Sequence, residues 1–261
     1  MLRSHYIQRV PLLTSTKLKL AYAGLAIADT WLSGSPDPRA HRARVLTKPL
    51  LMPTLMASLV TNPKAAGPPL RTSTLVAQAG GWGGDLALMG DGSASFVAGS
   101  GSFAVGHAAY MSGFLRNRGP ARPGPKAVAA LWAVTAPGMV FGAYRQEKAL
   151  GPTIAGYSAM LAGTVAAATQ LDPALPRSAR RATLLGAGLF MLSDSLLGTR
   201  RFLLKNPLAR LESVVMATYT AAQFLLSEGA ARAGRTASLR TTRPAPARAG
   251  AACAPGRRRT R

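Results

Sequence analysis

The chain has 261 residues, of which 48% are hydrophobic and only 16% charged, and its formal net charge is +23. Soluble globular domains carry about a quarter charged residues, so this composition argues against an ordinary soluble domain. The net charge suggests nucleic acid, but most Lys and Arg residues lie at the ends of apolar stretches or within residues 229–261. Because no nucleic-acid-binding motif accompanies them, we expect no nucleic-acid partner.

Nearly charge-free stretches of roughly 17–22 residues separate the basic clusters, and this length matches the hydrocarbon core of a bilayer. In chain order they predict eight transmembrane helices, over residues 18–34, 46–61, 72–90, 96–115, 127–144, 149–170, 181–198 and 212–228. Several are rich in Ala, Gly, Ser and Thr, and small residues let helix backbones approach closely. The expected fold is an all-α, multi-pass bundle of about eight transmembrane helices in the cell membrane.

Two basic segments flank the predicted transmembrane domain, which covers residues 18–228. Residues 1–17 are not expected to act as a secretory signal, because the apolar run VPLL is too short. Residues 229–261 lack apolar periodicity and are expected to form a disordered, Arg-rich tail. The simplest role for this tail is a solvated segment that sets topology. The alternative is a contact with anionic lipid head groups.

The distribution of loop charges predicts the orientation of the bundle. An even number of helices places both termini on one side of the membrane. That side carries the larger number of Lys and Arg residues in its loops, and the tail adds nine arginines. The positive-inside rule therefore predicts that both termini are cytoplasmic.

Acidic residues are rare, yet Asp29, Asp85, Asp194 and Glu212 lie within predicted helices. An ionised Asp at the centre of a membrane helix costs about 2.5–3.5 kcal/mol. Such residues are expected to face a polar interior, to pair with another charge or to perform chemistry. Asp29 is the weakest candidate, because it lies near the end of its helix.

The alternating direction of the helices predicts which of these charges meet. Asp85 and Asp194 lie past the midpoints of the third and seventh helices, which run in the same direction. Lys48 and Glu212 lie at the start of the second and eighth helices, which run in the opposite direction. All four therefore lie at a similar depth, and we expect them to share a polar pocket near the non-cytoplasmic side.

Two further pairs of polar residues each share one helix face. His107 and Tyr110 are three positions apart, and Tyr219 and Gln223 are four apart. We consider all four as possible lining of the same pocket. The alternative, and the commoner role for such residues, is a hydrogen bond between helices.

At these residues the sequence resembles the YhhN family, which includes the transmembrane lysoplasmalogenases. The resemblance spans about residues 20–228 and rests on the order and spacing of several motifs. These are TKPLLMPTLMA, GGWGGDLALMG, FAVGHAAYMSGF, FMLSDSLLG and ATYTAAQFLL.

The resemblance implies an eight-helix ether hydrolase that cleaves the vinyl ether bond of lysoplasmalogens, taken from the bilayer, to a fatty aldehyde and a glycerophospho-base. It implies catalytic roles for Asp85 and Asp194. It also implies a pocket lined by Lys48, His107, Tyr110, Tyr219 and Gln223. Lys48 either contacts the lipid head group or pairs with Asp85 or Glu212.

Two carboxylates suit this reaction. A neutral Asp donates a proton to the β-carbon of the vinyl ether, and an ionised Asp stabilises the resulting oxocarbenium ion and deprotonates water. Two close carboxylates in a poorly solvated site take different protonation states, as in glycosidases. We expect no metal or other cofactor, because His5, His41 and His107 are scattered and no zinc motif is present.

Two other functions fit the same residues. Intramembrane acids and His also mark proton relays, so the main alternative is a proton-coupled transporter or carrier of a lipid or small molecule. A third interpretation is a non-catalytic membrane protein in which the polar residues only hold helices together.

Overall fold

The computed structural model describes residues 10–65, 67 and 69–234, and within them the fold is helical. Eight α-helices follow one another in the chain. They are α1 (Val10–Ser33), α2 (Pro38–Val60), α3 (Arg71–Ala87), α4 (Gly92–Arg116), α5 (Gly124–Gln146), α6 (Leu150–Thr169), α7 (Arg177–Gly198) and α8 (Ala209–Ala233). A short 3₁₀ turn, η1 (Pro63–Ala65), precedes α3, and a π-helical turn, η2 (Thr199–Leu203), follows α7. The described residues contain no strand, only an isolated bridge between Arg118 and Leu171.

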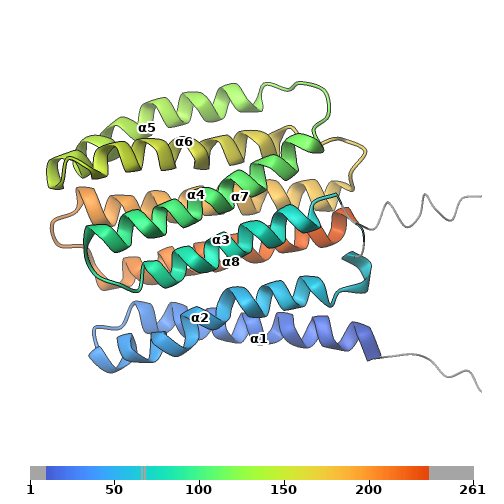
Figure 1. Ribbon diagram of the computed structural model, residues 1–261, viewed down its shortest axis with the longest axis horizontal. Coiled ribbons are helices and arrows are strands. Elements are labelled where there is room, and N and C mark those ends of the chain that lie inside the picture. Colours follow the sequence, from blue (N-terminus) through green and yellow to red (C-terminus); the bar gives the residue numbers. More distant parts are fainter. Residues whose placement is uncertain (1–9, 66, 68, 235–261) are drawn as a thin grey trace, which may run out of the picture.

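The helices lie side by side in one elongated bundle (Figure 1). Helices α1 and α2 form one edge, α5 and α6 form the other, and α3, α4, α7 and α8 lie between them. The start of α1 and the end of α8 lie at the same end of the bundle (Figure 1). The opposite end therefore carries the α1–α2, α3–α4, α5–α6 and α7–α8 connections.

Glycine sets the contact between α3 and α4. A Cβ added at Gly106 would lie 2.8 Å from the carbonyl oxygen of Ala77, and one added at Gly80 would lie 2.8 Å from the backbone nitrogen of Gly106. Only a residue without a side chain allows this approach of two backbones. The small residues of the third and fourth helices thus allow the two backbones to pack closely, as their composition predicts.

Two predicted boundaries are wrong. Helix α1 begins at Val10 rather than at residue 18, and α2 begins at Pro38 rather than at residue 46. The Asp37 side chain caps α2 by accepting a hydrogen bond from the backbone N–H of Arg39, and Pro38 occupies the first turn. The basic residues that indicated a loop therefore belong to the first turns of a helix.

The expected start of the tail at residue 229 is also wrong, because α8 continues to Ala233. Glu228 pairs with Lys19 of α1 and, at 3.2 Å, with Arg232. A Cβ at Gly229 would lie 3.0 Å from the backbone nitrogen of Thr183, so α7 and α8 are in close contact here. The expected disorder and lipid contact of residues 235–261 lie outside the described residues, as does Cys253.

Two helical segments among the described residues are long and apolar enough to cross a membrane by composition alone. They are Gly124–Gln146, with a mean hydropathy of 1.5, and Arg177–Leu203, with a mean hydropathy of 1.3. Several polar and charged residues of the other helices are buried against neighbouring helices, among them Asp29, Lys48, Gln78 and Gln223.

Candidate active site

A cavity of about 210 Å³ lies between the helices, towards the end of the bundle that is opposite the described termini. Its polar lining includes residues from α2, α3, α6, α7 and α8. Five residues singled out from the sequence or its family resemblance line it, namely Lys48, Asp85, Asp194, Glu212 and Tyr219. The depth argument from alternating helix direction therefore agrees with their common position in the structure.

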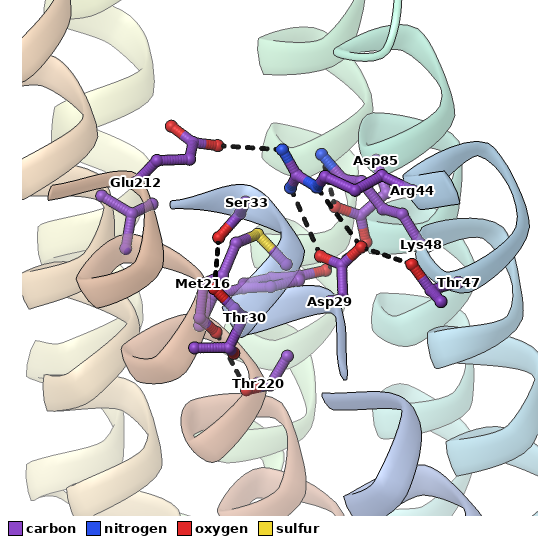
Figure 2. Close-up of polar contacts among 12 residues, drawn as sticks. Asp29, Thr30, Ser33, Arg44, Thr47, Lys48, Asp85, Glu212, Met216 and Thr220 are labelled. Atoms are coloured by element: carbon purple, nitrogen blue, oxygen red, sulfur yellow. Dashed lines mark hydrogen bonds and ion pairs between the residues drawn. The ribbon is translucent and has the colours of Figure 1, made fainter. Parts of the chain in front are cut away.

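Asp85 joins three helices at this cavity. It lies in the last turn of α3 and is only 3% exposed. Lys48 of α2 places its Nζ atom 3.6 Å from Oδ1 of Asp85 (Figure 2), and the hydroxyl of Tyr219 on α8 donates to Oδ2 at 2.7 Å. Of the two expected roles of Lys48, the structure thus shows the pairing with Asp85.

A proline in α2 helps to set the position of Lys48. Pro53 has no backbone N–H, so it leaves the carbonyl of Pro49 without its helical donor. The indole N–H of Trp82 on α3 donates to this carbonyl at 2.9 Å. The bond ties α2 to α3 close to both Lys48 and Asp85, and it supplies a partner for the carbonyl that Pro53 leaves without one.

Asp194 has a different environment on the opposite wall of the cavity. The hydroxyl of Tyr157 on α6 donates a hydrogen bond to its Oδ2 atom. The structure shows no ion pair between Asp194 and any cation of the described residues. Asp85 is therefore paired with a positive charge, whereas Asp194 is held by a neutral hydroxyl.

Sequence reasoning did not find Tyr157. It lies in the sixth helix, in the stretch IAGYSAM, where a polar group interrupts an apolar run. It precedes the centre of α6, whereas Asp194 lies near the end of α7, which runs in the opposite direction. The same depth argument that grouped the charged residues, applied to hydroxyl groups, identifies it.

His107 lies next to this wall and does not line the cavity. Its Nε2 atom is 3.5 Å from the hydroxyl of Tyr157, and its ring packs edge-on against Phe190 with the centroids 4.6 Å apart. His107 is 2% exposed. Tyr157 thus lies between His107 and Asp194 and contacts both.

Tyr110 and Gln223 also lie behind the cavity rather than in its wall. The Tyr110 hydroxyl donates to Oε1 of Gln223 at 2.9 Å, and Nε2 of Gln223 donates to the Tyr219 hydroxyl at 3.5 Å. Tyr219 in turn donates to Asp85. The expected direct contact of Tyr110 and Gln223 with the pocket is therefore replaced by a chain of hydrogen bonds between α4 and α8 that ends on Asp85.

A network of ion pairs borders the cavity (Figure 2). Asp29 is fully buried and accepts hydrogen bonds from Nε and Nη2 of Arg44, both at 3.3 Å, and from Thr47 at 2.7 Å. Arg44 also lies 3.6 Å from Glu212. The second oxygen of Glu212 is 2.8 Å from Nη1 of Arg200. The network joins α1, α2 and α8 and compensates the buried charge of Asp29.

The remaining lining of the cavity is largely apolar. It includes Leu88, Phe96, Met139, Ile154, Leu161, Leu197, Phe202, Val215 and Met216. Three acids, two phenol hydroxyls, one ammonium group and two guanidinium groups thus line a space that also accommodates hydrocarbon. Among the described residues, no group of three or more His, Cys, Asp and Glu side chains is arranged to hold a metal ion.

Comparison with models of known protein families gives a match. The family model described as the YhhN family matches residues 43–230, a range that runs from α2 into the last turns of α8 and includes every candidate site residue above except Asp29. The resemblance stated from the sequence motifs is confirmed. Neither a curated protein nor a solved structure matches the chain.

Proposed function

The chain belongs to the YhhN family, and from this premise we propose that it is an integral-membrane ether hydrolase that cleaves the vinyl ether bond of lysoplasmalogens. The observation that carries the proposal is that Asp85 and Asp194, from two different helices, line one cavity. Each accepts a hydrogen bond from a tyrosine, and only Asp85 has a cationic partner among the described residues.

The distribution of side chains supports a multi-pass position in the cell membrane. Large apolar residues point outward, among them Ile27 at 72%, Trp31 at 71% and Val134 at 81% exposure. Charged and amide side chains such as Asp29 and Gln223 are fully buried instead. An apolar exterior around a polar interior suits a lipid environment, in which backbone and polar groups must find partners inside the protein. The Lys and Arg distribution supports cytoplasmic termini.

The proposed reaction begins with a neutral Asp that protonates the β-carbon of the vinyl ether. The positive charge then lies on the adjacent carbon and its ether oxygen, as an oxocarbenium ion. Water adds to that carbon as a carboxylate removes its proton, and the hemiacetal breaks down to a fatty aldehyde and a glycerophospho-base. The two acids thus need opposite protonation states at the start.

The contacts of the two acids support an assignment of these roles. Lys48 stabilises the ionised form of Asp85, so we assign to Asp85 the stabilisation of the cation and the deprotonation of water. Asp194 has no such cation and carries its hydrogen bond on a single oxygen, so we assign to it the proton donation. Lys48, Tyr157 and Tyr219 are positioning residues in this scheme.

The test uses the full-length protein purified in detergent, with a 1-alkenyl lysophosphatidylethanolamine as substrate. Mass spectrometry should detect both the fatty aldehyde and glycerophosphoethanolamine. The matching 1-acyl and 1-alkyl lysolipids should stay intact, since neither has a vinyl ether to protonate. Asp85→Asn and Asp194→Asn should each abolish aldehyde release while the protein remains folded, and near-normal turnover of either variant would contradict the two-carboxylate mechanism.

The second candidate is a proton-coupled carrier of a lipid or small molecule. The chain of hydrogen bonds from Tyr110 through Gln223 and Tyr219 to Asp85 favours it, because such chains serve proton relays. A hydrolase acts in detergent, whereas a carrier needs a sealed vesicle and leaves its substrate intact. Uptake by proteoliposomes of an unaltered lipid, with no aldehyde formed in detergent, would select the carrier.

A further inference from the structure

A second groove of about 910 Å³ adjoins the candidate active site. It lies between the C-terminal end of α5 and the turn η2. The groove and the cavity share four lining residues, namely Leu197, Arg200, Arg201 and Phe202. A molecule that occupies both therefore passes beside the two arginines at the junction.

The charged side chains that line this groove are all cationic. They are Arg145, Arg200, Arg201 and Lys205. Arg200 is neutralised in part by Glu212 at 2.8 Å. For the other three, the structure shows no carboxylate partner among the described residues. The groove thus presents three uncompensated positive charges beside the cavity that Asp85 and Asp194 line.

Two local features direct these cations towards the groove. The amide Nε2 of Gln146, the last residue of α5, donates to the carbonyl of Arg201 at 2.8 Å and holds η2 against α5. The guanidinium group of Arg201 lies over the Phe96 ring, 4.3 Å from its centroid, and that of Arg145 lies 5.7 Å from the Phe141 centroid. The aromatic faces restrict both side chains and leave their N–H donors free for an anion.

We propose that this groove binds the phosphate of the lipid substrate, with Arg201, Arg145 and Lys205 as its ligands and Arg200 at the junction. The proposal rests on the proposed function, since it supplies the head-group site that the reaction requires. Lys48 is already paired with Asp85 and is not needed for this role.

The distance between the two sites suits the substrate. Asp194, near the end of α7, and Arg200, in the π-helical turn η2, are six positions apart in the sequence, which corresponds to about 9 Å or less along the helix axis. This is close to the span of an extended glycerol unit between a vinyl ether and a phosphate. The alkenyl chain then extends past Phe96, Met139 and Ile154 in the apolar part of the cavity.

The same lining predicts what the groove does not recognise. Its lining, among the residues that the structure describes, contains no Asp or Glu to pair with the amine of the head group. The phosphate should therefore determine affinity, and exchange of ethanolamine for choline should change it little. A lipid of the same chain without phosphate should bind weakly.

Binding of non-hydrolysable lipids to the full-length protein in detergent tests the proposal independently of turnover. The probes are 1-alkyl lysophosphatidylethanolamine, 1-alkyl lysophosphatidylcholine and 1-alkylglycerol, all of one chain length. We expect the two phospholipids to bind about equally, and at least 10-fold more tightly than the alkylglycerol.

The same assay tests the individual cations. Phospholipid binding should weaken in each of the variants Arg201→Gln, Arg145→Gln and Lys205→Gln, by on the order of 10-fold for the arginines, while alkylglycerol binding stays the same. Arg39→Gln, an exposed cation at the same end of the bundle that does not line the groove, serves as the control and should change nothing.

Several results would overturn the proposal. Equal affinity for the alkylglycerol and the phospholipids would show that phosphate is not recognised, and unchanged binding by all three variants would show that these cations do not bind it. A competition experiment shows whether the groove binds a lipid head group or any free phosphate. Glycerophosphoethanolamine should displace the lipid at concentrations at which inorganic phosphate does not, and equal displacement by both would identify a general anion site instead. Phosphate-dependent binding without aldehyde release from the vinyl ether would refute the proposed function and leave the groove assigned.

Discussion

Lys48 Nζ lies 3.6 Å from Oδ1 of Asp85 and joins α2 to α3 across the candidate active site. Asp194, on the other wall of the same cavity, has a tyrosine hydroxyl in place of a cation. The proposed reaction needs one ionised and one neutral acid. This difference in partners therefore supports the assignment of the base to Asp85 and of the proton donor to Asp194.

The first prediction concerns Lys48. In Lys48→Met, Asp85 loses the cation that favours its ionised form, the form that the proposed base requires. We expect aldehyde release to fall by on the order of 100-fold, the usual contribution of a general base. The double variant Lys48→Met/Asp85→Asn removes the unpaired carboxylate. It should recover any thermal stability lost in the single variant while staying inactive. Recovery of activity in the double variant would show that Asp85 is dispensable.

A variant of Tyr157 tests the role of the hydrogen bond to Asp194 on the other wall of the cavity. Tyr157→Phe removes one hydrogen bond to Asp194 and keeps the ring in contact with His107. We expect kcat to fall about 10-fold or more, with KM little changed, because the phenol holds the acid rather than the substrate. Tyr144→Phe is the matched control, since Tyr144 is half-exposed on α5 and outside the cavity. A normal kcat in Tyr157→Phe would remove this residue from the mechanism.

The ion pairs of Asp29 are predicted to serve stability rather than catalysis. Asp29→Asn removes the negative charge that pairs with the partly buried Arg44 and leaves the longer contact to Glu212 as the ion pair of Arg44. We expect a loss of about 1–3 kcal/mol in the free energy of unfolding, measured in detergent, with turnover per folded molecule retained. Asp37→Asn is the control, because Asp37 is exposed and Asn caps a helix as well as Asp does. If Asp29→Asn abolished turnover in a stable protein, the network would belong to the active site.

A pair of glycine variants tests the contact between α3 and α4. The Cβ of Gly106→Ala would lie 2.8 Å from the carbonyl oxygen of Ala77, a backbone atom that cannot rotate away. We expect this variant to be destabilised by about 1–3 kcal/mol. Gly101 lies on the same helix with nothing within 4 Å of an added Cβ. Gly101→Ala should therefore be neutral or slightly stabilising. Equal thermal stability of the two variants would contradict the close packing.

The number and order of the helices followed from the sequence because apolar stretches alternate regularly with basic clusters. The errors fell at helix ends, where other forces decide the boundary. Arg44 lies in a stretch that composition assigned to a loop, yet Asp37 and Pro38 start α2 before it and turn its side chain towards Asp29. Gly229 extends α8 because it packs against Thr183, a contact that no local pattern reveals.

The sequence by itself determined which groups share a depth. Helix direction alternates along the chain, so position within each helix sets the height of Lys48, Asp85, Asp194 and Glu212. Only the tertiary structure decided which of these groups touch, because that depends on the rotation of each helix about its axis. Close packing of small residues sets this rotation. The rotation brings Tyr157 to Asp194 and turns Tyr110 and Gln223 away from the cavity into a hydrogen-bonded chain. The turn η2 and the residues after it bring Arg201 and Lys205 to the same groove as Arg145.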